Sequence, residues 1–165
     1  MQPPGPAVTA YVGLGSNLGA SAALIDAAVK ALGELPGTRA IARSSLYRSA
    51  PIDAAGPDYL NAVAAIETTL AAPALLAQLH GIEARHGRER RGRNAPRTLD
   101  LDLLLYGEQV IDEAGLVVPH PRLHERAFAL LPLLEIAPDV AVPGKGCAAD
   151  LLAAVAAQTI ARLPR

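Results

Sequence analysis

The sequence predicts an α+β fold with a ferredoxin-like core in a single domain. Apolar runs and helical stretches alternate in the order β-α-β-β-α-β, which is the order of a ferredoxin-like unit. The chain has 165 residues, of which 51% are hydrophobic, and a chain of this length buries about 70% of its unfolded surface in one core. No internal repeat or second domain is visible. We expect the domain to span residues 8–163, after a disordered lead-in over residues 1–7.

The first three elements of the core are expected to be a strand, a helix and a second strand. Residues 7–14 form an apolar run that is typical of a buried strand, and a turn follows at Gly15. Over residues 21–33 the apolar side chains recur at helical spacing, and Gly33 ends the helix. Alternation and β-branched residues predict one long strand over residues 38–49.

The next three elements complete the core. Residues 59–70 predict a third strand, although this segment is rich in alanine. Pro73 begins a helix that extends to His86, because proline fits the first turn and the following leucines form an inner face. An alternating strand then ends at Gly107.

Additional elements follow the core. Two short segments, residues 109–111 and 116–118, predict a hairpin. Residues 125–136 predict a helix despite Pro132, which should break or kink it. Residues 150–160 predict an amphipathic C-terminal helix.

The composition narrows the functional class. The net charge is −1 and the pI is near 6.4, whereas general binding to nucleic acids or membrane surfaces normally needs a broad basic face. No apolar run approaches the roughly 20 residues of a membrane span, and the N-terminus has no signal-peptide pattern. The single cysteine, Cys147, rules out an intramolecular disulfide and fits a reducing cytoplasm. We therefore expect a cytoplasmic monomer with small-molecule partners, no nucleic acid and no membrane.

An Asp-x-Asp strand is the most informative feature of the chain. Asp100 and Asp102 alternate with leucines at positions 99, 101, 103 and 105. Because side chains two residues apart share one face of a strand, the leucines should point one way and both carboxylates the other. Neighbouring carboxylates repel each other unless a cation lies between them, and oxygen ligands suit Mg²⁺.

A cluster of arginines directly precedes this strand. Six of the thirteen arginines fall within thirteen residues. They are Arg85, Arg88, Arg90, Arg91, Arg93 and Arg97. Carboxylates that bind a metal beside guanidinium groups that bind phosphate are typical of a phosphoryl-transfer site. Either pattern alone is more common as a solvated strand edge or loop, but their combination favours a functional site.

Other interpretations of these residues compete with this one. A different Mg²⁺-dependent transferase, such as a glycosyltransferase acting on nucleotide sugars, could use Asp-x-Asp, although it would normally need a larger nucleotide-binding domain. An RNA-binding module could use the arginine loop, although exposed aromatics and an extended basic face are not evident. The glycines of residues 13–19 loosely resemble a dinucleotide fingerprint, but their spacing is wrong, so a tight strand-to-helix turn is favoured.

Several short motifs occur in order along the chain. They are Gly15-Ser-Asn-Leu18, Ser45-Leu-Tyr-Arg-Ser-Ala-Pro51, Pro57-Asp-Tyr-Leu-Asn61, Ile82-Glu83, Gly87-Arg88, Pro96-Arg-Thr-Leu-Asp-Leu-Asp102, Val118-Pro-His-Pro-Arg122, Glu125-Arg-Ala-Phe128 and Pro132-Leu133. With these motifs, residues 8–160 strongly resemble the 6-hydroxymethyl-7,8-dihydropterin pyrophosphokinase (2-amino-4-hydroxy-6-hydroxymethyldihydropteridine diphosphokinase) family.

The resemblance implies a specific reaction in folate biosynthesis. A member of this family would transfer pyrophosphate from its co-substrate ATP to the hydroxymethyl oxygen of the pterin, releasing AMP. Asp100 and Asp102 would hold two Mg²⁺ ions, and the spacing argument selects the same two residues independently. Positioning and charge neutralisation should supply most of the rate enhancement.

The resemblance also implies roles for individual residues. Catalysis would depend on Arg88, Arg97, Asp100 and Asp102. ATP would contact Glu83, Arg88, Arg97, His120 and Arg126. The pterin would contact Ser49, Ile52, Tyr59, Asn61 and Phe128, with Tyr59 and Phe128 on its two faces. From the residues alone, His120 could merely fill a turn, and the two aromatics could belong to the core.

The chain departs from some members of the family at four positions. These are His80, Asn94, Gly115 and Val117. The departures affect the expected contacts with adenosine and leave the metal-binding and phosphate-binding residues unchanged, so the details of adenosine recognition do not carry over.

Overall fold

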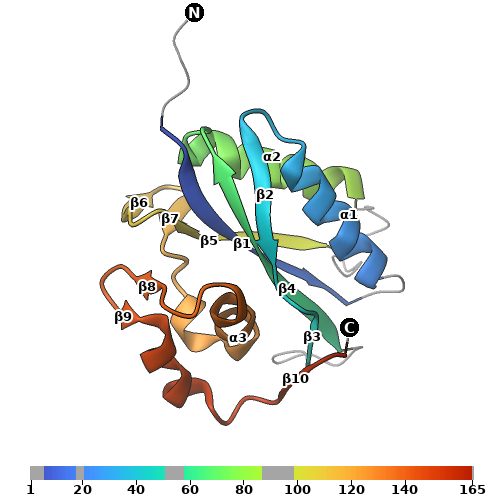
Figure 1. Ribbon diagram of the computed structural model, residues 1–165, viewed down its shortest axis with the longest axis vertical. Helices are drawn as coiled ribbons and strands as arrows, with labels where there is room; N and C mark the ends of the chain where they lie inside the picture. The colour runs from blue at the N-terminus through green and yellow to red at the C-terminus, as the bar shows by residue number, and fades with distance from the viewer. Residues whose placement is uncertain (1–5, 18–20, 51–57, 87–98, 165) are drawn as a thin grey trace, which may run out of the picture.

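The computed structural model describes residues 6–17, 21–50, 58–86 and 99–164. Its core contains the predicted order of strands and helices, with the second strand in two pieces (Figure 1). The core elements are β1 (Val8–Ser16), α1 (Ser21–Gly33), β2 (Thr38–Arg43), β3 (Tyr47–Ser49), β4 (Tyr59–Thr68), α2 (Ala72–His86) and β5 (Asp100–Tyr106). The predicted α+β fold is confirmed.

Within the described residues the main sheet has six strands, and β1 and β4 lie at its centre. β1 pairs with β4 on one side and with β5 on the other, antiparallel to both. β2 and β3 pair with different parts of β4, and the C-terminal strand β10 (Ile160–Arg162) extends the sheet beyond β3. This interleaved arrangement of two β-α-β units is that of a ferredoxin-like core.

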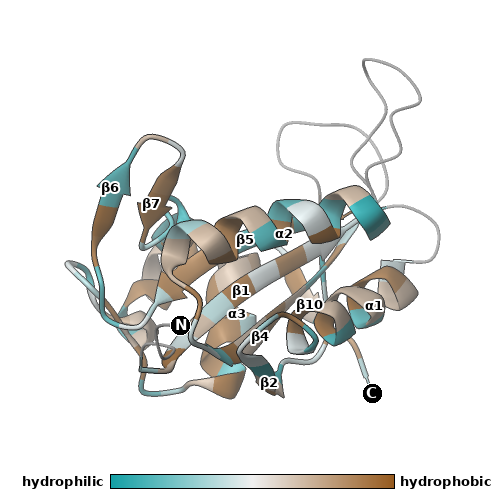
Figure 2. Cartoon of the chain, turned by 90° about the horizontal axis from the view of Figure 1, so that it is seen from above, coloured by the Kyte–Doolittle hydropathy of each residue, from teal (hydrophilic) through white to brown (hydrophobic). Residues whose placement is uncertain are grey.

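Helices cover both faces of the sheet. On one face, α1 and α2 lie side by side over the strands (Figures 1 and 2), and a core cluster including Val12, Ile66 and Leu79 joins the two layers. On the other face, α3 (Ala127–Ile136) packs through a second cluster that includes Val63 and Leu130. Because α3 covers only part of that face, the ends of β1, β4 and β5 beyond it border a pocket.

The first helix illustrates how local sequence determines an element. Ile25, Ala28 and Leu32 recur at intervals of three and four residues and are fully buried. Gly33 ends the helix, as expected. The observed bounds of α1 match the prediction because this apolar stripe and the glycine are both local signals.

The prediction of one long strand over residues 38–49 is wrong, because residues 44–46 separate β2 from β3. The register of β2 also shifts between Ala40 and Ala42. At the break, the Ser44 hydroxyl accepts a hydrogen bond from the Val63 backbone N–H at 2.9 Å. A side chain thus takes the place of a backbone ladder partner, and the strand is interrupted there.

The C-terminal region also differs from the prediction. In place of a helix over residues 150–160, a 3-10 helix, η2 (Ala148–Val155), is followed by strand β10. A hairpin of β8 (Ala141–Val142) and β9 (Gly146–Cys147), which the sequence analysis did not predict, precedes η2. Pairing of β10 with β3 is a tertiary interaction, and it overrides the local helical pattern.

Two elements between β5 and η2 are shifted from their expected positions. The hairpin consists of β6 (Ile111–Glu113) and β7 (Leu116–Val118), so its first strand begins two residues later than expected, at the end of a projection in Figure 2. α3 begins at Ala127, because Leu123–Glu125 form a separate 3-10 turn, η1. Pro132 lies inside α3 without ending it, although its nitrogen cannot donate to the Phe128 carbonyl.

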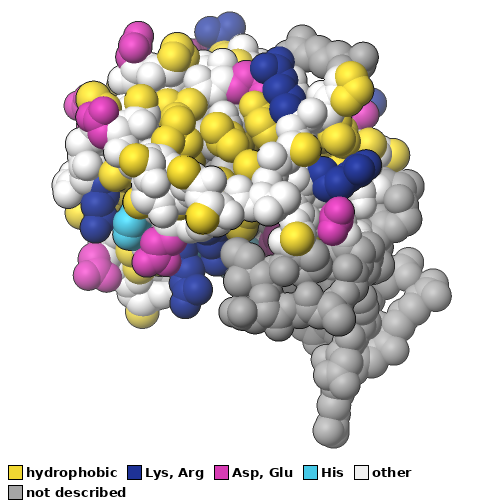
Figure 3. All heavy atoms as spheres, turned by 90° about the horizontal axis from the view of Figure 1, so that it is seen from below, with side chains coloured by type: hydrophobic (Ala, Val, Ile, Leu, Met, Phe, Trp, Pro, Cys, Tyr) yellow, Lys and Arg dark blue, Asp and Glu magenta, His cyan; other side chains and the backbone are white. Residues whose placement is uncertain are grey.

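The described surface carries charges of both signs. On the face in Figure 3, basic and acidic side chains are interspersed rather than gathered into one broad basic area. No helix within the described residues is long and apolar enough to cross a membrane.

Candidate active site

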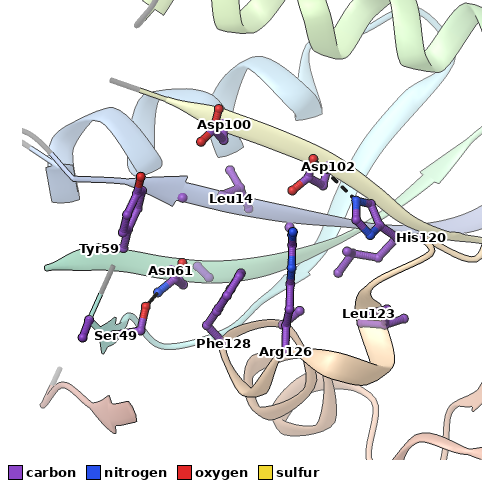
Figure 4. A pocket seen from close by; sticks show the side chains of 16 residues that line it. Leu14, Ser49, Tyr59, Asn61, Asp100, Asp102, His120, Leu123, Arg126 and Phe128 are labelled. Atoms are coloured by element: carbon purple, nitrogen blue, oxygen red, sulfur yellow. Dashed lines mark hydrogen bonds and ion pairs between the residues drawn. The ribbon is translucent and has the colours of Figure 1, made fainter. Parts of the chain in front are cut away.

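A pocket of about 250 Å³ lies between the partly uncovered face of the sheet and the beginning of α3 (Figure 4). Its lining brings together residues from four strands and from the segment between β7 and α3. The lining residues are Gly13, Leu14, Gly15, Ser49, Ala50, Tyr59, Asn61, Ala62, Asp100, Asp102, Leu104, His120, Leu123, Arg126, Phe128 and Ala129. Eight of the twelve predicted site residues are among them.

β5 places both aspartates on the pocket side of the sheet. Leu101 and Leu103, which alternate with Asp100 and Asp102, belong instead to the core under α1 and α2. The predicted separation of carboxylates from leucines is therefore confirmed for these four residues. It is wrong for Leu105, which joins the opposite cluster because the pairing of β5 with β1 shifts register just before it.

Glycines form the floor between the carboxylates and β4. Gly13 pairs with Asp102 and Gly15 with Asp100, and the same two glycines face β4 on their other side. The expectation that these glycines form a tight turn is wrong, because β1 continues through Ser16. Sequence reasoning missed them as pocket residues, and strand alternation together with the register of β1 against β5 would have been the signal.

A buried carboxylate on α2 fixes the backbone between the two aspartates. Glu83 is only 5% exposed, and its Oε2 accepts a hydrogen bond of 2.8 Å from the Leu101 N–H. Glu83 does not line the pocket. The expectation that it contacts ATP remains a prediction, whereas its contact with the Leu101 peptide ties the start of β5 to α2.

His120 approaches the aspartates from the segment after β7. Its Nε2 lies 4.0 Å from Asp102 Oδ1, and the Asp102 side chain is 45% exposed. The His120 backbone N–H donates to the Leu104 carbonyl at 2.9 Å, which holds this segment against β5. Its Nδ1 accepts from the Arg122 N–H at 3.1 Å, so the neutral ring carries its proton on Nε2.

The electrostatic environment of His120 favours the neutral ring. Burial lowers the pKa of His120, and the positive charges of Arg126 and Arg122 lower it further, while Asp102 acts in the opposite direction. In this state the ring presents an N–H donor toward the carboxylate end of the pocket.

An amide and two aromatic side chains line the other end of the pocket (Figure 4). Asn61 is buried on β4, and its Nδ2 donates to Ser49 Oγ at 2.7 Å and to the Tyr47 carbonyl at 3.5 Å. The Tyr47 carbonyl can only accept a hydrogen bond, so the Asn61 side-chain atom that faces it is the amide nitrogen and not the amide oxygen. The Asn61 Oδ1 lies close to the Gly15 backbone: a Cβ atom placed on Gly15 would be 3.4 Å from this oxygen.

The beginning of α3 contributes two adjacent pocket side chains. Arg126 and Phe128 lie next to each other, with the guanidinium carbon 5.4 Å from the ring centroid. This separation is within the range of a cation–π interaction. Tyr59 lies at the far side of Asn61 from this pair in Figure 4.

Three predicted site residues, Ile52, Arg88 and Arg97, lie outside the described residues. Within the described part of the chain, no group of three or more His, Cys, Asp or Glu side chains could hold a metal. The described carboxylates of the pocket are therefore a pair, which leaves most of a cation's coordination to other ligands.

Comparison with known families places the chain in a family. Residues 11–138 match the family described as 7,8-dihydro-6-hydroxymethylpterin-pyrophosphokinase. The chain belongs to this family. It is accordingly an ATP-dependent pyrophosphokinase, and the transferase activity and folate pathway expected from the motifs are confirmed at this level.

Two relatives named 2-amino-4-hydroxy-6-hydroxymethyldihydropteridine pyrophosphokinase illustrate the match. The protein from Pseudomonas aeruginosa is 48% identical over 155 residues, covering 93% of this chain and 96% of the relative. The protein from Haemophilus influenzae is 44% identical over 146 residues, covering 88% of this chain and 91% of the relative.

Solved structures support the fold of this pyrophosphokinase. A Plasmodium falciparum HPPK-DHPS triple mutant superimposes with a TM-score of 0.71 at 14% identity, over 88% of this chain and 44% of that chain. An HPPK-DHPS described as in complex with substrates gives a TM-score of 0.69 at 12% identity, over 92% of this chain and 43% of that chain. This chain therefore spans less than half the length of those proteins.

Proposed function

We propose that this pocket binds ATP with Mg²⁺ and 6-hydroxymethyl-7,8-dihydropterin, and transfers pyrophosphate from the first to the second. The observation that carries the proposal is the division of one pocket into two chemically different ends (Figure 4). Carboxylate and basic groups line one end, whereas a buried amide and two aromatic rings line the other. A transfer between a polyphosphate and a flat heterocycle needs both ends in one cavity.

The donor set at the carboxylate end fits Mg²⁺. Asp100 and Asp102 are oxygen donors on one strand face, and the glycines opposite them provide no side chain that could neutralise them. We assign two Mg²⁺ ions to this pair, with phosphate oxygens and water as the remaining ligands. Bound Mg²⁺ would neutralise negative charge on the triphosphate and on the departing AMP.

Basic side chains next to the aspartates can bind the phosphates. His120 offers its Nε2–H as a neutral donor, and Arg126 offers a guanidinium group that can form paired hydrogen bonds to phosphate. Arg88 and Arg97 are proposed as further phosphate ligands from the segment outside the described residues. Glu83 would act on the nucleotide from beyond the pocket lining.

The opposite end of the pocket fits the pterin. Asn61 Oδ1 can accept from the ring's amino and N3–H groups, because Asn61 Nδ2 is already bonded to Ser49. Phe128 and Tyr59 provide apolar surfaces for the two ring faces. Ile52, outside the described residues, completes the proposed set.

This arrangement orients the reacting groups. The pterin hydroxymethyl oxygen would form a bond to the β-phosphorus while the bond from that phosphorus to the oxygen of the α-phosphate breaks. The hydroxyl proton is lost to solvent, and AMP leaves with the bridging oxygen. Holding both substrates in one pocket supplies the positioning that dominates phosphoryl-transfer catalysis.

The products test this proposal directly. The purified chain, given Mg²⁺, ATP and 6-hydroxymethyl-7,8-dihydropterin, should form AMP and the pterin diphosphate in equal amounts. ADP and a pterin monophosphate would contradict the proposed bond cleavage. A cytoplasmic, monomeric enzyme remains our expectation, and gel filtration of the same sample tests the oligomeric state.

A further inference from the structure

The side chain of Gln158 bridges the two peptide groups on either side of Arg126. Its Oε1 accepts a hydrogen bond of 2.9 Å from the Ala127 N–H. Its Nε2 donates a hydrogen bond of 2.7 Å to the Glu125 carbonyl. One amide from the C-terminal segment therefore contacts the chain immediately before and immediately after a pocket-lining arginine.

The N-terminus of α3 lacks a local side-chain cap. Arg126 occupies the N-cap position in an extended conformation, and its own side chain makes no capping hydrogen bond. The Arg126 carbonyl accepts from the N–H groups of Ala129 and Leu130, which begins the helix. Gln158 supplies the missing acceptor for the first helical N–H, a task usually performed by Ser, Thr, Asp or Asn at the N-cap itself.

Gln158 is itself held between two anchored positions. Its backbone N–H donates to the Val155 carbonyl at 3.0 Å, and Val155 is buried in the cluster under α3. Two residues later, Ile160 begins β10 and pairs with Ser49, which accepts the hydrogen bond from Asn61. The bridge therefore connects the start of α3 to the edge of the sheet beside the pocket.

We infer that Gln158 is a positioning residue for both substrates. It fixes the backbone around Arg126, so that Arg126 and Phe128 project into the pocket as an adjacent pair. The inference rests on the proposed function, in which Arg126 contacts phosphate and Phe128 contacts the pterin. Gln158 does not line the pocket, so it acts only through these two side chains.

Two variants of Gln158 test the inference, with substrate binding measured by calorimetry. Gln158→Ala should weaken a non-hydrolysable ATP analogue and the pterin alike, each by about threefold to tenfold. Gln158→Glu should restore part of this loss, because it keeps an acceptor for Ala127 and places negative charge at a helix N-terminus. Gln109→Ala, at an exposed glutamine outside the pocket, is the matched control and should bind like the wild type.

A second readout separates this inference from the proposed function. Hydrogen exchange at the Ala127 amide should be at least about threefold faster in Gln158→Ala than in the control, whatever the substrates are. A wild type that makes no AMP would overturn the proposed function and leave this exchange result standing. The positioning role would be overturned if Gln158→Ala bound both substrates as tightly as the wild type does. It would also be overturned if the variant differed from the wild type only in having a lower melting temperature. If Gln158→Ala does not fold, equal binding by Gln158→Glu and Gln158→Met would overturn it, since only the glutamate keeps the acceptor.

Discussion

Removing the Phe128 ring should separate pterin binding from ATP binding. The ring is only partly buried, it lines the pocket, and the guanidinium carbon of Arg126 lies 5.4 Å from its centroid. In Phe128→Ala, loss of an aromatic stacking partner costs about 0.5–1.5 kcal/mol beyond the area it buries. Because the buried area adds to this value, we expect the pterin to bind at least about tenfold more weakly, equivalent to roughly 1.4 kcal/mol.

The same substitution should affect ATP much less. Phe128→Ala leaves the carboxylates and basic groups in place and removes only the ring beside Arg126. A cation–π contact at an accessible site is worth about 0.5–1 kcal/mol, so ATP should bind at most about fivefold more weakly. Calorimetric titrations of each substrate separately give both values.

A matched control distinguishes a lost stacking partner from a loosened core. Tyr11 packs against the same hydrophobic cluster as Phe128 but does not line the pocket. Tyr11→Ala should therefore lower the melting temperature with little change in pterin affinity. If Phe128→Ala weakened ATP and pterin equally, or if Tyr11→Ala reproduced its effect, the assignment of Phe128 to the pterin would be refuted.

Two further predictions concern carboxylates that accept hydrogen bonds from the protein. Glu83→Ala leaves the Leu101 N–H without its buried acceptor and should lower the free energy of unfolding by about 1–3 kcal/mol. Glu83→Gln keeps an acceptor, so it should lower the free energy of unfolding less. Equal midpoints of urea unfolding for the two variants and the wild type would contradict this prediction. Glu135, only 13% exposed, accepts hydrogen bonds from Tyr47 and Ser45, and although burial alone would raise its pKa, these bonds lower it. A depressed folded pKa stabilises the protein above the ordinary value of 4.5, and this stabilisation is lost as pH falls through the folded pKa. Glu135→Gln should thus be less stable at pH 7 by about 1–3 kcal/mol, with a difference that shrinks below pH 4.5; a difference independent of pH would contradict the assignment.

Elements with a strong local pattern could be predicted from the sequence. The apolar spacing in residues 21–33 and the alternation around Asp100 and Asp102 both depend on neighbours within a few positions. The order of these elements was also sufficient to predict the ferredoxin-like core, because that topology follows from the order of the strands and helices. The position of both carboxylates on one face of the strand could be predicted for the same local reason.

Features that depend on distant contacts could not be predicted in this way. The break at Ser44 arises from a hydrogen bond to Val63, nineteen positions away, and β10 exists because it pairs with β3. The hydrogen bond between Glu83 and Leu101 likewise joins two elements. Gly13 also looked like part of a turn, and only its register against Asp102 identifies it as part of the pocket floor.

The turnover of Asp100→Asn and Asp102→Asn tests the central claim most directly. An asparagine keeps the size of the side chain but removes the negative charge that the proposed Mg²⁺ ions require. We expect each variant to retain the wild-type melting temperature within a few degrees and to form AMP several orders of magnitude more slowly than the wild type. Near-normal turnover in either variant would contradict the assignment of these carboxylates as the metal ligands of the pyrophosphokinase.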